Sequence, residues 1–379
     1  MKAFCAIFGL SVLLLAAVPD WLNSGGDPQR SGWQKRDRYI TRDSLPKFQL
    51  LWKLKLDNES REANTLTAPV IYGPIITHRG MKELVFIAGA SDNVYAVDAD
   101  LGRLFWKRHF ETSRDGCAGG LTAAPVLAPQ VSPNDAYEDP TPPRPLYVLT
   151  SDGNLHTLRT TNGLDYGPPV KFLAPNARAS NLNFAGTAVH TTTSGGCGGV
   201  PDGLWALDVT SPDAKPRFTA AKGTGVASGF DGTIHTASIP FQWKGRELFL
   251  STAFSPALAE ARGLATWVDS NGIRWVYAAL PRGISAFRLT GPDALEPAWT
   301  SQAMNAPVAP VIVNGMVFAL STDTAVLYAL EGATGKELYS SGKTVTSAVN
   351  SSGLALANGH VCFGTADNTL YCFGIPTDI

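Results

Sequence analysis

The chain lacks the sequence features that mark several common classes of protein. Charged residues make up only 17% of its 379 residues, and the formal net charge is -1. Because a nucleic-acid-binding protein needs a basic excess to neutralise phosphates, we expect no nucleic-acid partner. No segment from residue 48 onward has the apolar period of a convincing amphipathic helix. Glycine (37) and proline (26) instead suit many short strands joined by tight turns.

The motifs of familiar catalytic sites are also missing. The sequence has no Gly-x-Ser-x-Gly elbow and no glycine-rich phosphate loop, and its six histidines do not pair at metal-ligand spacing. The absence of Cys-x-x-Cys-His excludes covalently attached c-type haem, and no two cysteines are adjacent. The sequence therefore predicts no catalytic residue and no metal ligand.

The first eighteen residues differ from the rest of the chain. Lys2 is the only early charge, residues 3–18 are nearly all apolar, and small residues precede Pro19. An apolar run of about sixteen residues is short for a membrane span, and its flanks are typical of a secretory signal peptide. We predict a signal peptide over residues 1–18 and an exported protein, periplasmic or extracellular, with no integral membrane segment after the signal is removed.

Four cysteines follow this signal: Cys117, Cys197, Cys362 and Cys372. An even number in an oxidising compartment permits disulfides. Cys117 and Cys197 lie in glycine-rich loops that we expect on the same face, so we predict a disulfide between them. Cys362 and Cys372 lie on the two arms of one hairpin, where we expect reduced, buried thiols, with their pairing left open.

The sequence contains a short repeat of strands separated by a polar turn and a glycine turn. Its two clearest copies share an alanine, an acid two residues later, a glycine four residues after the acid and an aromatic four residues after the glycine. These positions are Ala96, Asp98, Gly102 and Trp106 in the first copy, and Ala329, Glu331, Gly335 and Tyr339 in the second. A unit of this size cannot bury its own apolar face, so the units must stack on one another.

The spacing of the repeats predicts the architecture. The central strands of the visible units are Val94–Val97, Leu155–Leu158, Leu204–Leu207, Ile284–Phe287, Leu327–Leu330 and Leu370–Phe373. The interval of 80 residues between the third and fourth is about two ordinary intervals of 43 residues, which predicts a degenerate unit within residues 224–262. Four strands per unit of about 40–50 residues is the spacing of a propeller blade. We predict an all-β propeller of seven four-stranded blades, with eight as the alternative.

The two ends of the repeat array predict how the ring closes. The last unit stops at Ile375 after its third strand, whereas a spare strand at residues 50–56 precedes the first unit. Pairing this strand with the last blade would complete that blade and remove an exposed edge. We predict a single propeller domain over residues 48–379, preceded by a polar lead-in over residues 19–47 that wraps over the surface.

These units resemble the repeats of PQQ-type β-propellers, the quinoprotein family. Its tryptophan-docking motif reads Ala-x-Asp-x-x-Thr-Gly-x-x-x-Trp, which the first copy matches except for Leu101 and the second except for Glu331 and Tyr339. Further stretches are similar to an uncharacterised exported bacterial branch with PQQ-like repeats: residues 26–34, 297–301 and 363–371. In that family the motif is structural: the tryptophan stacks between blades, the acid fastens the turn and the glycine adopts the tight conformation.

The resemblance carries an expectation about cofactors. Quinoprotein dehydrogenases have adjacent cysteines over the quinone, a Ca²⁺ held by acidic and amide side chains, and an aspartate base. This sequence has no adjacent cysteines and no recognisable counterpart of the other elements. We therefore predict no cofactor and keep PQQ with calcium as the alternative.

Aspartate recurs in the turns between the second and third strands of the units, at Asp92, Asp152, Asp202, Asp323 and Asp367. In a propeller these turns share one face, so the carboxylates would form a ring at the channel mouth that attracts cations or polar ligands. Aspartate also bonds its own turn, and asparagine or glycine follows four of the five. We favour this structural role.

Without a catalytic constellation, the sequence favours a binding protein over an enzyme. We predict an exported, monomeric propeller that acts as a non-catalytic binding or scaffold module for a protein or polymer ligand on a loop face. The alternative is a quinoprotein-like oxidoreductase with PQQ and calcium in the central channel. A third class, a glycan-binding or lyase propeller, would need acids clustered with exposed aromatics at the channel mouth.

Overall fold

The computed structural model describes residues 20–60, 65–111, 121, 123–128, 144–211, 213–221, 226–228, 234–236, 239–243, 246–250, 255–291, 294–349 and 353–376. Within these ranges nearly every element is a β-strand, and short 3₁₀ helices occur at η1 (Leu45–Lys47), η3 (Cys197–Gly199) and η4 (Pro256–Leu258). No helix in this described part is long and apolar enough to cross a membrane. The predicted signal peptide, residues 1–18, lies outside the described residues.

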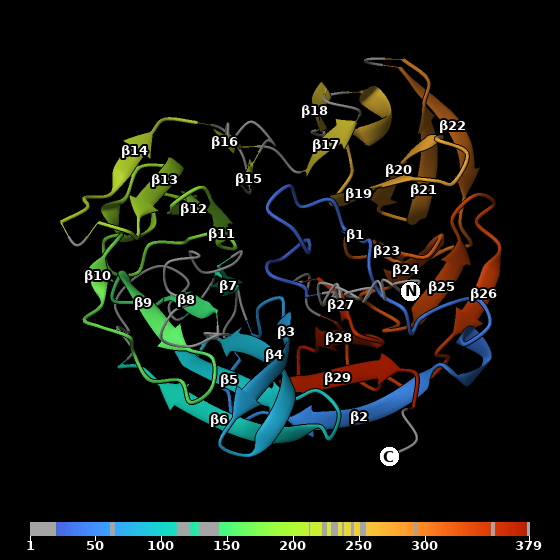
Figure 1. Ribbon diagram of the computed structural model, residues 1–379. Coiled ribbons are helices and arrows are strands. Elements are labelled where there is room, and N and C mark those ends of the chain that lie inside the picture. The colour runs from blue at the N-terminus through green and yellow to red at the C-terminus, as the bar shows by residue number, and fades with distance from the viewer. Residues whose placement is uncertain are drawn as a thin grey trace, which may run out of the picture.

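The strands form sheets arranged around a ring, antiparallel except for one parallel strand pair (Figure 1). Three sheets follow one another in the first half of the chain. They contain β3 (Val70–Thr77), β4 (Gly80–Gly89), β5 (Asn93–Asp98) and β6 (Arg103–His109); β7 (Val126–Leu127), β8 (Pro145–Leu149), β9 (Asn154–Arg159) and β10 (Val170–Lys171); and β11 (Asn183–Ala185), β12 (Ala188–Thr193), β13 (Gly203–Asp208) and β14 (Arg217–Thr219).

Three more sheets complete the second half of the ring. They contain β19 (Gly263–Val268), β20 (Arg274–Leu280), β21 (Gly283–Leu289) and β22 (Leu295–Thr300); β1 (Trp33–Gln34) with β23 (Val311–Val313), β24 (Met316–Leu320), β25 (Leu327–Glu331) and β26 (Glu337–Ser340); and β2 (Gln49–Lys55) with β29 (Thr369–Gly374), β28 (His360–Gly364) and β27 (Ala355–Ala357). The all-β propeller predicted from the repeats is therefore present.

The arc predicted to be degenerate contains two separate hairpins. β15 (Ala227–Ser228) pairs with β16 (Ile234–His235), and β17 (Ile239–Trp243) pairs with β18 (Arg246–Leu250). Among the described residues of this arc there is no four-stranded sheet. The count of seven four-stranded blades therefore stays a prediction.

The ring closes between the two ends of the chain. β2 pairs antiparallel with β29, from Gln49 opposite Gly374 to Lys55 opposite Thr369. The last sheet thus takes its outermost strand from the N-terminal side, which confirms the predicted closure. Because β2 covers the outer edge of β29, that strand has no unpaired ladder groups.

The tryptophan of the repeat motif fastens the first sheet to the second. Trp106 Nε1 donates a hydrogen bond to Thr160 O at 2.8 Å. A Cβ built on Gly163 would lie only 2.8 Å from the Trp106 ring. Within its own turn, Asp98 Oδ1 accepts the backbone N–H groups of Asp100 and Leu101, each at 3.1 Å. A glycine is needed where the neighbouring indole covers the turn.

The second copy of the motif has a similar local geometry. The ring of Trp299 lies against Gly335, where a Cβ would be 2.5 Å from it. Tyr339, paired with Ala329 across the strands, packs edge-on against Phe48 with ring centroids 4.9 Å apart.

The lead-in differs from the surface segment we expected, since its first half lies inside the ring (Figure 1). We call residues 20–34 the inner segment. Trp21 is only 1% exposed and exchanges backbone hydrogen bonds with Ile71. Only the second half, which we call the strap (residues 35–44), crosses an outer face, and most of its side chains are exposed or half-buried.

The inner segment bonds to one inner strand after another. Its partners in the ring are Ile71 on β3, Leu127 on β7, Asn183 on β11, Ser228 on β15, Thr266 on β19, Ile312 on β23 and Leu356 on β27. Gln34 Nε2 also donates to Asp20 O at 3.3 Å, so the segment nearly returns to its own start. Residues from one end of the chain therefore link sheets from all parts of it.

The state of Cys362 and Cys372 differs from the one we expected. Cys362 and Cys372 form a disulfide rather than remaining reduced, and both are fully buried. They lie directly opposite each other on β28 and β29 with Cα atoms 4.1 Å apart, because the register of that hairpin aligns them. Cys197 is also disulfide-bonded, while its predicted partner, Cys117, lies outside the described residues.

Candidate functional site

The two faces of the ring carry different turns. The face crossed by the strap, which we call the strap face, carries those described turns that join first to second and third to fourth strands, such as Asn314-Gly315 between β23 and β24. The opposite face carries the turns between second and third strands. The strap is held on two Asn-Gly turns: Asn314 Nδ2 donates to Asp37 O at 2.9 Å and to Ile40 O at 2.8 Å, and Gly359 N–H donates to Asp37 Oδ2 at 2.7 Å.

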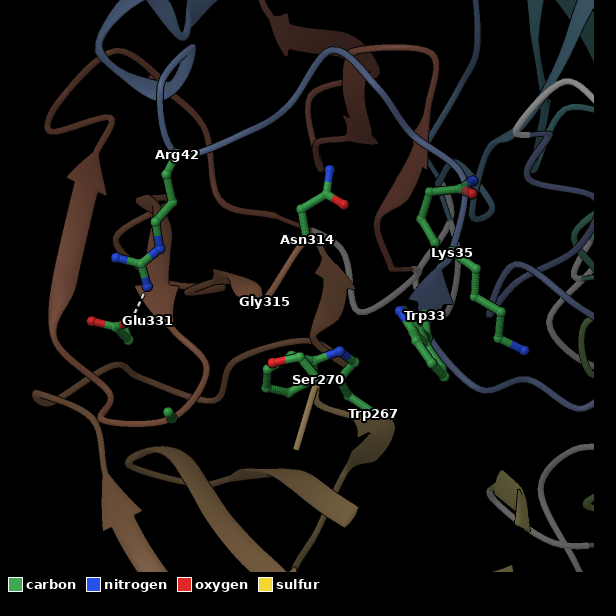
Figure 2. Close-up of a pocket in the computed structure, with 10 residues that line it drawn as sticks. Trp33, Lys35, Arg42, Trp267, Ser270, Asn314, Gly315 and Glu331 are labelled. Atoms are coloured by element: carbon green, nitrogen blue, oxygen red, sulfur yellow. Dashed lines mark hydrogen bonds and ion pairs between the residues drawn. The ribbon is translucent and has the colours of Figure 1, made fainter. Parts of the chain in front are cut away.

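A pocket opens on the strap face where the end of the inner segment meets two sheets (Figure 2). Its volume is about 380 Å³. Its lining combines two indoles with amide, cationic and anionic side chains: Trp33, Gln34, Lys35, Arg42, Trp267, Ser270, Asn314, Gly315, Glu331 and Ala333. Aromatic surface with a few convergent polar groups is the usual composition of a ligand-binding pocket.

The polar groups of the pocket are held by contacts between elements that are far apart in sequence. Arg42 of the strap forms an ion pair with Glu331 at the end of β25 (Figure 2). Lys35 Nζ lies 5.0 Å from the centroid of the Trp33 ring. Their side chains remain 48% exposed for Arg42 and 45% for Lys35, so both keep hydrogen-bond donors available to a ligand.

The indole of Trp267 is positioned by two glycines. A Cβ on Gly332 would lie 3.0 Å from the ring, and one on Gly315 would lie 3.5 Å from it. The ring also stacks near Trp275, with centroids 6.5 Å apart. A rigid, half-buried indole is therefore presented at the pocket wall.

A second group of polar side chains lies where the first sheet meets the last. Glu83 comes from β4, Asp100 from the turn after β5, and His360 begins β28. Glu83 Oε1 is 3.7 Å from His360 Nδ1, and Asp100 Oδ1 is 3.9 Å from His360 Nε2. Burial raises the pKa of Glu83. Burial alone would lower the pKa of His360, but the Glu83 carboxylate outweighs it and raises that pKa.

Asp20, at the start of the inner segment, lies near this group. Its carboxylate accepts the backbone N–H of Gly73 at 3.4 Å and pairs with Arg144 at 3.3 Å. Burial raises the pKa of Asp20 to about 6, although Arg144 opposes the shift.

The five predicted turn aspartates lie on the opposite face. Asp152 accepts hydrogen bonds from Thr150 Oγ1 at 2.5 Å and from the backbone N–H and side-chain amide of Asn154 at 3.1 and 2.6 Å. Burial alone would raise the pKa of Asp152, but these bonds lower it. Asp367 is similar: Thr365 and Thr369 donate to it at 2.6 and 3.1 Å, and its pKa is lowered despite partial burial.

The other three aspartates differ in their surroundings. Asp202 Oδ1 accepts the backbone N–H of Gly196 at 2.9 Å, across its own loop. Asp92 is fully buried and accepts a hydrogen bond from Ser151 of the next sheet. Asp323 is exposed. Most of these carboxylates therefore accept hydrogen bonds from nearby turns.

Of the pocket residues, sequence reasoning selected only Glu331, as a member of the blade motif. Trp33 and Trp267 lie outside that motif. Their position outside it is the one sequence signal for the pocket, because a tryptophan that does not dock one sheet on the next can serve in ligand binding. The strap residues carried no such signal, since Arg42 meets Glu331 only through the folded ring.

Comparisons with known proteins identify the fold. No protein-family model and no curated protein matches the chain. Quinohemoprotein alcohol dehydrogenase from Comamonas testosteroni is similar at 12% identity and a TM-score of 0.55, covering 95% of this chain and 81% of that one. A quinohemoprotein alcohol dehydrogenase from Pseudomonas putida HK5 covers the same shares at 12% identity and a TM-score of 0.61.

A third solved structure, BamB from Moraxella catarrhalis, covers 86% of this chain and 97% of that one, at 16% identity and a TM-score of 0.45. That similarity is too low to carry an argument. Together the two dehydrogenase structures show that the chain has the β-propeller fold. At 12% identity they show the fold alone.

The alternative taken from the sequence resemblance places PQQ with calcium in the central channel, and the residues at the inner strands can be compared with that requirement. The inner segment already bonds there to β3, β7, β19 and β23 among others. A planar quinone at this level would have to displace those hydrogen bonds, each of which satisfies a backbone group that is costly to leave unpaired. These residues therefore do not fit the cofactor at this position.

Proposed function

We propose that this propeller is an exported, non-catalytic binding module that takes a polymer or protein ligand in the pocket on the strap face. The observation that carries the proposal is the inner segment. It bonds to the inner strands around the ring, so a cofactor bound at that level would have to displace these bonds. The pocket at the end of that segment stays open to solvent.

The chemistry of the pocket favours a ligand with polar repeating units, a glycan strand before a peptide. Flat sugar faces pack on indoles such as Trp33 and Trp267. Side chains with two polar atoms, such as Arg42 and Glu331, can each bond a pair of neighbouring hydroxyl groups.

Export and a monomeric state belong to the same proposal. Export is supported by the apolar start of the sequence and by the buried Cys362–Cys372 disulfide, since disulfides persist mainly in oxidising compartments. Light scattering of the purified protein tests the monomeric state, and fractionation of expressing cells tests export.

The binding proposal is tested with arrays of bacterial glycans and of peptides, probed with the purified protein and with its Trp267→Ala and Trp33→Ala variants. We expect saturable binding to a glycan class that each variant weakens by about tenfold or more, because stacked aromatics dominate such sites. As a matched control, Trp299→Phe alters an indole outside the pocket and should leave binding unchanged. Binding that the pocket variants do not alter would contradict the proposal.

The oxidoreductase alternative has a direct test. The purified protein is incubated with PQQ and Ca²⁺ and assayed for dye-coupled oxidation of alcohols and sugars. Stoichiometric binding of PQQ with turnover would overturn the non-catalytic proposal.

A further inference from the structure

The group formed by Glu83, Asp100 and His360 contains two buried polar atoms that lack partners. Within the described residues, neither Glu83 Oε1 nor His360 Nδ1 has a hydrogen-bond partner. The side chains are only 10% exposed for Glu83 and 7% for His360. Buried polar groups are normally satisfied, so two facing orphan atoms indicate that something else occupies their shared space.

The distance between these two atoms suits a shared metal ion better than a direct hydrogen bond or a bridging water molecule. At 3.7 Å, Glu83 Oε1 and His360 Nδ1 are too far apart for a hydrogen bond. Two atoms bridged by water through hydrogen bonds of ordinary length lie about 4.5–5 Å apart, which is wider than this gap. Two ligands at about 2.1 Å from one ion lie roughly 3.4 Å apart at the tetrahedral angle, close to the observed spacing.

A third ligand is available at the surface. One ligand atom from each of the three residues can be chosen so that all lie within 4.8 Å of one another. Asp100 is exposed, lies in a turn and has its Oδ1 3.9 Å from His360 Nε2, so its carboxylate must turn toward the Nδ1 side to join Glu83 at one ion. The buried pair and the exposed carboxylate leave a remaining position for water.

We propose that Glu83, His360 and Asp100 bind a divalent transition-metal ion of the zinc type. One imidazole and two carboxylates are ligands that Zn²⁺ accepts, whereas Ca²⁺ prefers a larger set of oxygen atoms. Buried Asp37, which accepts Gly359 N–H next to His360, adds negative charge near the site. The ion joins β4 and the turn after β5 to β28, so it links the first sheet to the last.

This site is separate from the ligand pocket. The pocket lining includes none of the three proposed ligands, so the failure of either proposal leaves the other standing.

The test is a titration of the full chain. The protein is purified, treated with a chelator and dialysed, and ZnCl₂ is then added in a calorimeter at neutral pH. We expect one saturable site per chain. His360→Gln and Glu83→Gln should weaken binding by about a hundredfold and Asp100→Asn by about tenfold. Asp323→Asn, which alters an exposed carboxylate on the opposite face, is the matched control and should bind as the unchanged protein does.

Two further measurements keep the proposal open to contradiction. Substitution of a buried ligand can unfold the protein, so Asp100→Asn, at an exposed position, decides the case if the others do not fold. Co²⁺ should give a visible absorption band that Asp100→Asn shifts. The absence of a stoichiometric Zn²⁺ site, tighter binding of Ca²⁺, or an Asp100→Asn variant with unchanged affinity and spectrum would each overturn the assignment.

Discussion

The carboxylates of the propeller fall into two kinds. Asp152 and Asp367 on the opposite face, like Asp98 on the strap face, accept hydrogen bonds from their own turns. Asp37 and Glu331 instead bond Gly359 and Arg42, which are far from them in the sequence. A carboxylate that bonds its own turn stabilises local structure, whereas one that reaches a distant segment builds a surface that only the folded ring possesses. The ligand pocket includes a carboxylate of the second kind, Glu331.

The largest expected effect comes from removing the anchor of the inner segment. Trp21 is fully buried, and a Cβ on Gly26 would lie 2.7 Å from its ring. Trp21→Ala should lower the free energy of unfolding by about 4 kcal/mol, since it leaves a large cavity. Urea denaturation measures the change. Trp267→Ala, at a half-buried wall of the pocket, is the control and should lower the free energy of unfolding much less. Equal losses in the two variants would show that the inner segment does not stabilise the ring more than the pocket wall does.

The pH dependence of stability should report Asp20. Its folded-state pKa of about 6 lies above the ordinary value of 3.8, so the folded protein binds this proton more tightly than the unfolded chain does. The stability it contributes is therefore complete below pH 4 and is lost as the pH rises from about 4 to about 6. The loss should be about 3 kcal/mol.

Asp20→Asn provides the comparison for this titration, because the amide does not ionise. Thermal unfolding of both proteins between pH 4 and pH 7 should give curves whose difference changes mainly below pH 6. Parallel curves over that interval would show that Asp20 is not buried as described.

A smaller loss is expected when a cross-element carboxylate is removed from the strap face. Asp37 accepts the backbone N–H groups of Tyr39, Ile40 and Gly359 at 2.9, 2.8 and 2.7 Å. Asp37→Ala should lower stability by about 2 kcal/mol, because these donors lose a charged acceptor. Hydrogen exchange should also become faster at Gly359, which a purely local defect in the strap would not cause.

The smallest effect is expected on the opposite face. Asp152→Ala removes bonds within a single turn whose backbone reaches solvent, and should cost about 1 kcal/mol. Chemical denaturation next to Asp37→Ala gives the comparison directly. If Asp152→Ala proved the more damaging of the two, the distinction between local and cross-element carboxylates would be wrong.

Much of the fold is predictable because its causes are local. The pattern around Gly102 and Trp106 identifies a blade from a few consecutive residues, and the missing strand after Ile375 predicts that residues 50–56 complete the last sheet. The disulfide between Cys362 and Cys372 was missed because it depends on the register of a hairpin, which the spacing of the cysteines does not reveal.

Most of the candidate site could not be predicted, because its contacts join residues that are far apart in the sequence. The inner segment has no apolar period, and its hydrogen bonds go to strands spread from Ile71 to Leu356. Trp33 and Trp267 become neighbours of one pocket only after those bonds form. Side chains whose partners lie hundreds of positions away leave no trace in a local pattern.

The seam between β2 and β29 has a consequence for how the molecule is made. Gln49 is synthesised more than three hundred residues before Gly374, yet these two residues are paired. Until β29 has been synthesised, β2 has no partner and its unpaired edge is open to self-association. Ring closure therefore waits for the synthesis of residues 369–374, and a chain truncated before residue 369 would lack the strand that β2 pairs with.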